Sequence, residues 1–332
     1  VTIIGAAGSE VATADSVSIF NRGNTGEDQY VFHLQSADNV TVSFLSLTGG
    51  YYGVNVTDSD TITLNSLEVY GNANMGLAID NESDDFAITG GTFYSNGSHG
   101  IYIRGYGEIT DSTVYGNYYD GIRVENYSAA SDSKTVYITG ATVYENGSRN
   151  VYIYTSSTPE NGWYGVELSN STIYHSDINS YYGSVYARNV LVSNNDIYAG
   201  SGGIDARGSS FIHNNVVHGT GDTGIYLRDT SSAIGNRIWG NLDVGLYIST
   251  YTVSEIKENM IYNNVVGIHA VLNYGTADTI SNNIVYNNSE VGIRVDGNDS
   301  AVLTLVNNTV LQQTGRAIDV MGNTENFLFL NN

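Results

Sequence analysis

The sequence predicts an all-β protein built as a solenoid, in which short parallel strands stack in successive coils. Three observations predict this fold class: a composition rich in strand and turn formers, one phrase that repeats along most of the chain, and the lack of helical periodicity. Val, Ile, Tyr and Phe favour strands, whereas Gly, Asn, Asp and Ser favour turns. With 38 Gly, 27 Tyr and one Pro among 332 residues, the composition is typical of many short strands joined by tight turns.

One phrase recurs down the chain and determines the architecture. An apolar residue and usually Tyr precede a polar pair that often ends in Asn, and Gly-Ile-x-Val follows after a short spacer, as at Gly121–Val124 and Gly292–Val295. Ten steps of this phrase separate Tyr70 from Leu311, about 24 residues per repeat. A unit of this length buries its apolar face only by stacking on its neighbours. The Tyr position is occupied by Tyr70, Tyr94, Tyr115, Tyr144, Tyr174, Tyr198, His218, Trp239, Tyr262, Tyr286 and Leu311.

The repeat leaves no room for a helix. Each copy holds two or three short runs that alternate at period 2, and none shows the period of 3.6. An ordinary parallel sheet needs a crossover of about a dozen residues, usually helical. The remaining solution is a coil in which each repeat makes one turn and equivalent strands pair in parallel.

This repeat pattern resembles the parallel β-helix of the pectate-lyase type, the superfamily of polyuronate lyases and mannuronan epimerases. The resemblance implies a single-stranded right-handed solenoid, here of about 12 coils. We expect one domain over residues 1–332, with first coils in 1–39, regular repeats in 40–326 and the start of a further coil in 327–332. Because solenoid ends are normally capped, the apolar ends of this chain predict a fragment of a longer protein with flanking domains.

The charge of the chain excludes several classes of protein. It carries 34 Asp and Glu against 12 Lys and Arg, a formal net charge of −22, and its only lysines are Lys134 and Lys257. A nucleic-acid binder needs a basic surface, so we expect no nucleic-acid partner. No apolar run reaches about 18 residues, so we expect no membrane insertion. The absence of Cys excludes disulfides, thiolate metal ligands and a cysteine nucleophile.

Two columns of the repeat predict structural ladders. An Asn precedes the Tyr position by three residues in six successive coils, and stacked amides bond one another. The N-terminal half has Ser112, Ala141 and Ser171 at this place, so this ladder covers half the coil. We expect the Tyr column to stack as a structural ladder as well, rather than to bind sugar. The six asparagines are Asn195, Asn215, Asn236, Asn259, Asn283 and Asn308.

The Gly-Ile-x-Val strand predicts which residues face outward. Ile and Val point inward, so x and the residue two further on point out. These two positions per repeat hold six of the ten arginines. The guanidinium fork suits carboxylates and sulfates, and Tyr offers a flat face and a hydroxyl to a sugar ring. The alternative is a solvated sheet whose arginines pair with neighbouring acids. The predicted substrate-binding residues on these columns are Tyr102, Arg104, Arg123, Tyr152, Tyr154, Tyr186, Arg188, Asp205, Arg207, Tyr226 and Arg228.

Two consecutive repeats are longer than the others. Their insertions, at residues 125–135 and 155–165, follow the outward strand on adjacent coils. Long loops beside a rigid scaffold often carry function, so we add Trp163 to the predicted substrate-binding residues. Simple solubilising loops are the alternative.

Three outward residues on successive coils predict catalysis. Abstraction of the proton next to a uronate carboxylate requires a base, an acid and a cation. We expect Tyr247 and His269 to share the roles of acid and base, in either order, and Arg294 to neutralise the carboxylate. The resemblance implies a lyase or an epimerase, because such enzymes of this fold use mixtures of Tyr, His, Arg, Lys and Asp as catalytic residues. The sequence lacks the Asp-Pro-His motif of the epimerases, the polygalacturonase motifs and the Gly-Gly-x-Gly-x-Asp calcium repeats, so no family's catalytic residues carry over.

These observations together predict a secreted or cell-surface protein that binds an anionic polysaccharide and acts as a lyase or C5-epimerase. The rival interpretations are a non-catalytic adhesion segment and a phage tailspike-like glycan receptor. A hydrolase is disfavoured because Asp205 has no outward acid on a neighbouring coil. No metal ligands are assigned. Ca²⁺ is the one cofactor that the sequence suggests, through the oxygen ligands of Asp84, Asp85, Asp205, Asp229, Asp296 and Asp319.

Overall fold

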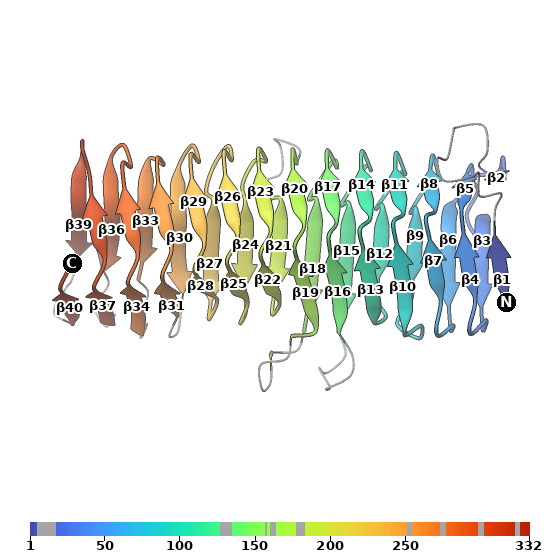
Figure 1. Cartoon of the computed structure of the whole chain (residues 1–332), viewed down its shortest axis with the longest axis horizontal. Coiled ribbons are helices and arrows are strands. Elements are labelled where there is room, and N and C mark those ends of the chain that lie inside the picture. Colours follow the sequence, from blue (N-terminus) through green and yellow to red (C-terminus); the bar gives the residue numbers. More distant parts are fainter. Residues whose placement is uncertain are drawn as a thin grey trace. The chain divides into compact units, whose positions relative to one another are not determined.

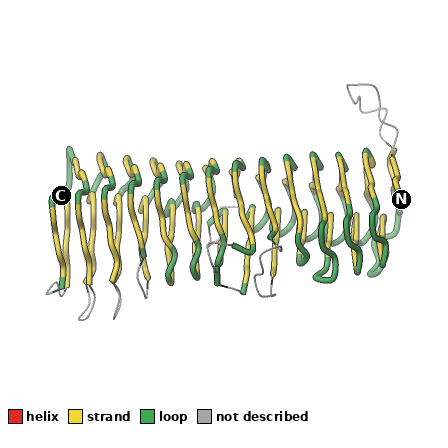
Figure 2. The backbone as a smooth tube through the Cα atoms, turned by 60° about the horizontal axis from the view of Figure 1, so that its bottom comes forward, coloured by secondary structure: helices red, strands yellow, loops and turns green. Residues whose placement is uncertain are grey.

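The computed structural model describes residues 1–4, 18–126, 135–156, 158–159, 164–176, 183–250, 254–272, 277–297, 302–322 and 326–332. All forty elements assigned within these ranges are strands, and they pair in parallel. The chain divides into two compact units, Val1–Ile173 and Tyr174–Asn332, and each is described by itself. Within each unit the chain visits three sheets in turn, three strands to a coil (Figures 1 and 2). The predicted all-β solenoid of parallel coils is therefore confirmed.

In Val1–Ile173 the coils follow one another in sequence order. The first sheet contains β1 (Thr2–Ile4), β4 (Thr41–Ser43), β7 (Thr63–Asn65), β10 (Phe86–Thr89), β13 (Gly107–Thr110), β16 (Val136–Thr139) and β19 (Val166–Ser169). The second contains β2 (Ser18–Asn21), β5 (Leu45–Thr48), β8 (Glu68–Tyr70), β11 (Thr92–Tyr94), β14 (Thr113–Tyr115) and β17 (Thr142–Tyr144). The third contains β3 (Tyr30–Gln35), β6 (Tyr52–Thr57), β9 (Leu77–Ile79), β12 (Ile101–Ile103), β15 (Ile122–Asn126) and β18 (Val151–Thr155).

Tyr174–Asn332 repeats this order, and β20 (Thr172–Tyr174) includes the boundary residues. The first sheet contains β22 (Leu191–Ser193), β25 (Phe211–His213), β28 (Ser232–Ile234), β31 (Glu255–Lys257), β34 (Ala277–Ser281), β37 (Val302–Val306) and β40 (Phe327–Leu330). The second contains β23 (Asp196–Tyr198), β26 (Val216–His218), β29 (Arg237–Trp239), β32 (Met260–Tyr262), β35 (Ile284–Tyr286) and β38 (Thr309–Leu311). The third contains β21 (Val185–Arg188), β24 (Ile204–Arg207), β27 (Ile225–Asp229), β30 (Val244–Thr250), β33 (Val266–Val271), β36 (Val291–Gly297) and β39 (Arg316–Gly322).

Period-2 alternation builds the core of each coil. On β12, Ile101 and Ile103 are 0% exposed and Tyr102 between them is half-buried and faces outward. The same alternation holds on β15, where Ile122 and Val124 are buried. Stacked aliphatic side chains fill the interior of each unit, so the outward residues of the third sheet are free for other roles.

The glycine of the Gly-Ile-x-Val phrase is required by close packing between coils. A Cβ at Gly245 would lie 2.8 Å from the carbonyl oxygen of Gly267 on the next coil and 2.8 Å from Asn264 Nδ2. Gly267 meets Gly292 in the same way, with the carbonyl oxygen 2.5 Å from the added Cβ. The phrase thus begins with glycine because the next coil approaches too closely for a side chain.

The predicted asparagine ladder is present in Tyr174–Asn332. The amide Nδ2 of Asn215 donates to Asn236 Oδ1 over 3.1 Å, and Asn236 donates to Asn259 over 3.0 Å. Each of these asparagines is at most 1% exposed. A second ladder follows the Tyr position and was not predicted. Its members are Asn72, Asn96, Asn117, Asn146 and Asn150 in the first unit and Asn241, Asn264 and Asn288 in the second.

The Tyr column stacks, as predicted. In the first unit Tyr94 and Tyr115 have ring centroids 5.0 Å apart and planes 1° apart. In the second unit His218 stacks on Trp239 at 4.5 Å and 3°. Because the faces of these rings cover one another, only their edges are open, and a sugar ring has no aromatic face to lie on.

Candidate functional site

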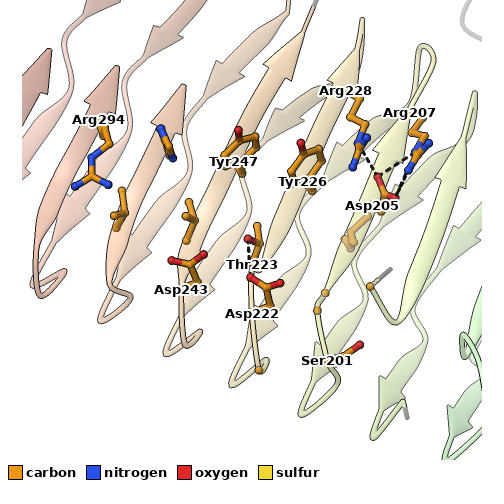
Figure 3. Close-up of a pocket in the computed structure, with 18 residues that line it drawn as sticks. Ser201, Asp205, Arg207, Asp222, Thr223, Tyr226, Arg228, Asp243, Tyr247 and Arg294 are labelled. Carbon is orange, nitrogen blue, oxygen red and sulfur yellow. Dashed lines mark hydrogen bonds and ion pairs between the residues drawn. The ribbon is translucent and has the colours of Figure 1, made fainter. Parts of the chain in front are cut away.

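A groove of about 980 Å³ crosses the outward face of the third sheet in Tyr174–Asn332. It extends over β24, β27, β30, β33 and β36, so its long direction follows the stack of coils (Figure 3). All three predicted catalytic residues line it, together with four of the predicted binding residues. The charged and aromatic side chains among its lining residues are Asp205, Arg207, Asp222, Tyr226, Arg228, Asp243, Tyr247, His269 and Arg294.

The column predicted from the repeat forms the floor of this groove. Strand register aligns Asp205 with Tyr226, and Tyr226 with Tyr247. It continues from Tyr247 to His269 and from His269 to Arg294. Five side chains from five coils therefore form one row, with neighbours about 4.8 Å apart at the backbone.

His269 is held by a carboxylate from the next coil. Its Nε2 lies 2.8 Å from Asp296 Oδ2, and its side chain is 16% exposed. Because a carboxylate only accepts hydrogen bonds, this contact places the ring proton on Nε2 and leaves the lone pair of the neutral ring on Nδ1. Asp296 Oδ1 has no hydrogen-bond partner among the described residues and is buried. The pair resembles the base and orienting group of a proton-transfer site.

Tyr247 lies between His269 and a second tyrosine. Its ring meets His269 edge to face, with centroids 5.0 Å apart, and stacks on Tyr226 at 4.5 Å. Burial raises the pKa of the Tyr247 phenol above its usual value, and Tyr226 and Asp296 act in the same direction. Tyr247 therefore keeps its proton at neutral pH and is suited to act as an acid.

Arg294 completes the row beside His269. Its nearest acidic partner is Glu290, with Nη2 and Oε2 3.8 Å apart, and the Glu290 side chain is 63% exposed. A pair this long and this exposed contributes little stability. Arg294 Nε makes no hydrogen bond within the described part of the chain. Its positive charge is thus available to an anion beside the His269 ring.

Two further arginines converge on one buried carboxylate. Arg207 Nη2 lies 2.9 Å from Asp205 Oδ2, and Arg228 Nε lies 3.5 Å from Asp205 Oδ1 (Figure 3). Asp205 is 5% exposed, so it lies beneath the two guanidinium groups. Arg228 also stacks over Tyr226, 4.2 Å from the ring centroid. We call Asp205, Arg207 and Arg228 the arginine clamp. It carries two positive charges and one negative charge.

A family model described as the right handed beta helix region matches residues 2–135, 129–234 and 161–301. The chain belongs to the right-handed beta helix family. Solved structures agree with this fold. The A-modules of the Azotobacter vinelandii mannuronan C-5 epimerases AlgE4 and AlgE6 are 14% and 15% identical to the chain, with TM-scores of 0.59 and 0.60. The alignments cover 89% and 90% of this chain and 89% of each module. The comparison with curated proteins found no match.

Sequence reasoning missed two acids of this β-helix groove. Asp222 and Asp243 are exposed and lie in the turns before β27 and β30, along the edge opposite the arginine clamp (Figure 3). Both belong to turns, and strand alternation assigns no outward direction to turn residues, so the outward columns did not include them. Their signal was an acid two residues before the Gly of the phrase, at Gly224 and Gly245.

The acids balance the cations of the groove. Its lining carries three Arg and three Asp besides His269, in a chain of formal net charge −22. The groove is thus less acidic than the protein as a whole, without being basic. Placement of the charges, rather than their sum, has to select the ligand.

The first unit of the β-helix places predicted binding residues in an ion network. Arg123 Nη1 contacts Asp120 Oδ2 at 2.9 Å, and Arg123 Nε donates to Glu125 Oε1 over 2.9 Å. Tyr102 donates to Glu125 Oε2 over 2.9 Å, and Tyr152 lies under the Arg123 guanidinium at 4.1 Å. The hydrogen bond and burial raise the pKa of Tyr102 to about 12, burial contributing most. Two carboxylates thus balance Arg123, as the solvated-sheet alternative expected.

Other predicted binding residues of the β-helix lie apart from the groove lining. Tyr186 is 8% exposed beneath the Arg207 guanidinium, and Arg188 pairs in register with Arg207. Tyr154 lies in register with Glu125, and Arg104 Nε has no hydrogen-bond partner among the described residues. Trp163 and most of the two predicted insertions lie outside the described residues.

No group of three or more His, Asp or Glu is placed to share a metal ion within the described residues. Three of the six acids that suggested Ca²⁺ pair with side chains of the protein: Asp205 with the clamp arginines, Asp296 with His269, and Asp319 with Arg316 at 2.7 Å. The same part of the chain contains no helix that could span a membrane.

Proposed function

We propose that the protein binds a uronate-containing polysaccharide in the groove and acts on it by abstracting the proton at C5. The observation that carries this proposal is the row His269, Tyr247 and Arg294, in which Asp296 orients the histidine. A base, a protonated acid and a cation on adjacent coils are the three groups that this reaction requires. A polymeric substrate of this kind places the protein outside the cytoplasm.

The roles follow from the proton positions. His269 Nδ1 takes the C5 proton, while Arg294 binds the sugar carboxylate and stabilises the charge that develops on it. In elimination, Tyr247 gives its proton to O4, the C4–O4 bond breaks and a C4–C5 double bond forms. In epimerisation, Tyr247 gives its proton to the opposite face of C5 and no other bond changes. Both outcomes use the same abstraction step.

The structural neighbours support a carbohydrate substrate. The two A-modules with TM-scores of 0.59 and 0.60 are mannuronan C-5 epimerases by their names. At 14% and 15% identity their likeness to this chain is one of fold, so the reaction rests on the groove residues. Asp222 and Asp243 also support hydrolysis as a second candidate reaction, because these two acids lie on adjacent coils and line the groove. Neither acid is buried, so the His269 row remains the stronger candidate.

The test is incubation of the protein with alginate, pectate and sulfated glycans, with and without Ca²⁺. Unsaturated-uronate absorbance detects elimination, proton NMR detects C5 inversion, and reducing-end assays detect hydrolysis. We expect elimination or inversion that is lost in His269→Ala and reduced at least about a hundredfold in Tyr247→Phe. The variant Arg316→Ala, in which the lost side chain is 69% exposed outside the groove lining, should keep full activity.

Other results would favour the rival interpretations. Retention on immobilised glycan without any product would leave a binding module or adhesion segment. A trimer in solution, measured by mass, together with binding alone, would favour a tailspike-like receptor. Absence of both binding and product with every uronate glycan would overturn the proposal.

A further inference from the structure

We infer that the groove selects glycans whose two carboxylates lie on sugars three to four positions apart along the chain, one carboxylate bound at the arginine clamp and one at Arg294. This inference rests on the proposed function and specifies its substrate class. The clamp arginines come from β24 and β27, and Arg294 comes from β36.

The distance between the two cationic positions follows from strand register. Asp205, the centre of the clamp, is aligned through Tyr226, Tyr247 and His269 to Arg294. The two positions are therefore three to four coil steps apart, about 14–19 Å. One coil step is close to the length of one sugar in an extended chain. A glycan that follows the groove thus places about one sugar on each coil.

The clamp is built to receive one carboxylate. Asp205 is 5% exposed and neutralises one of the two guanidinium charges, which leaves a net charge of one. The Arg228 side chain is 39% exposed, so part of it is accessible to a ligand. Asp205 and the Tyr226 ring hold the Arg228 guanidinium in place, so little rotational freedom is lost when an anion binds.

The coils between the two cationic positions disfavour additional carboxylates. The coils between the clamp and Arg294 are those of β30 and β33, where Tyr247 and His269 occupy the row, and neither strand contains an arginine or lysine. Asp243, in the turn before β30, lines the edge of these coils and is exposed. A carboxylate on an intervening sugar would meet this acid without an arginine beside it, whereas a neutral sugar offers it hydroxyl donors. The groove therefore favours uronates separated by neutral sugars over an uninterrupted polyuronate.

The experiment measures binding as a function of oligosaccharide length and composition. Oligosaccharides of two to six sugars, from a glycan with one uronate in every three or four sugars and from a pure polyuronate, are titrated calorimetrically into the intact protein and three variants. The variants are Arg228→Ala, the double variant Arg207→Ala with Arg228→Ala, and the control Arg316→Ala. For the wild type we expect Kd to fall at least about tenfold once the chain reaches four or five sugars. At equal length the mixed glycan should bind more tightly.

The variants separate this inference from the proposed function. Arg228→Ala and the double variant should abolish the step in Kd with length while leaving the shortest oligosaccharides unchanged, and Arg316→Ala should keep the step. A step that persists in the double variant, or equal affinity for the two glycans at every length, overturns the inference while the proposed function stands. Failure of every uronate oligosaccharide to bind overturns both.

Discussion

His269 donates a hydrogen bond from Nε2 to Asp296 Oδ2 over 2.8 Å, although the two residues are 27 positions apart in the sequence. The bond joins β33 to β36, so it depends on the register between two coils. A carboxylate at this place stabilises one tautomer of the ring and fixes its orientation. The lone pair that the proposed reaction needs is therefore on Nδ1.

Replacing Asp296 by Asn tests whether this carboxylate positions His269, because the variant keeps the histidine itself. The amide carries no charge and can also donate, so both ring tautomers become populated. We expect kcat on a uronate substrate to fall about tenfold to a hundredfold with KM nearly unchanged, because Asp296 is not among the groove-lining residues. Nitrogen NMR of the labelled ring should show a mixture of tautomers. The control Asp319→Asn, one coil further along the sheet, should leave kcat and the spectrum as in the wild type; a normal kcat in Asp296→Asn would exclude the positioning role.

Replacing Gly245 by Ala should destabilise the second unit. The added Cβ would lie 2.7–2.8 Å from Ile261 Cγ2, Asn264 Nδ2 and the Gly267 carbonyl oxygen. Overpacking of this kind costs about 1–3 kcal/mol of the free energy of unfolding. The control Gly26→Ala adds a Cβ whose nearest neighbour is 3.4 Å away. Denaturant unfolding of both variants checks the difference; equal midpoints would refute the close-packing role of the phrase glycine.

The repeat allowed the fold and the row of the groove to be predicted from sequence. Period-2 alternation decides which side chains point outward, and equal spacing decides which of them share a column, so Tyr247, His269 and Arg294 could be aligned in advance. Which charged side chains pair with one another could not be predicted, because this depends on the direction in which each long side chain points. Arg123 points toward Asp120 and Glu125, whereas the acidic contact of Arg294 among the described residues is the long, exposed one to Glu290. Asp222 and Asp243 were missed because they lie in turns, and period-2 alternation assigns an outward direction only to strand residues.

Replacing Asn236 by Ala should interrupt the asparagine ladder. Asn236 Oδ1 accepts from both the backbone N and Nδ2 of Asn215, and its own Nδ2 donates to Asn259 Oδ1 and to the carbonyl of Ile212. All three asparagines are buried, and an orphaned buried polar group costs about 1–3 kcal/mol. We expect the free energy of unfolding to fall by about 3 kcal/mol, measured by denaturant titration. The exposed Asn81→Ala is the control and should change it by less than about 0.5 kcal/mol; a similarly small effect at Asn236 would show that the ladder adds little stability.

His99 should make the stability of the protein depend on pH. Its Nδ1 accepts a hydrogen bond from the backbone N of Asp120 over 3.1 Å, so this nitrogen is unprotonated, and its 3.5 Å approach to Asp120 Oδ2 is not an ion pair. Burial lowers the pKa of His99 below its usual 6.5, although Asp120 and Glu125 oppose the shift and Arg123 adds to it.

The sign of the pH effect follows from which state binds the proton. Below pH 6.5 the unfolded chain takes up a proton at His99 that the folded protein resists, so stability is full above this pH and declines as the pH falls. The decline from this one group cannot exceed about 1.4 kcal/mol per pH unit. In His99→Gln, whose amide oxygen can accept the same hydrogen bond, we expect a smaller loss of Tm between neutral and mildly acidic pH than in the wild type. The exposed His33→Gln should follow the wild type; parallel curves for all three proteins would rule out His99 as the titrating group.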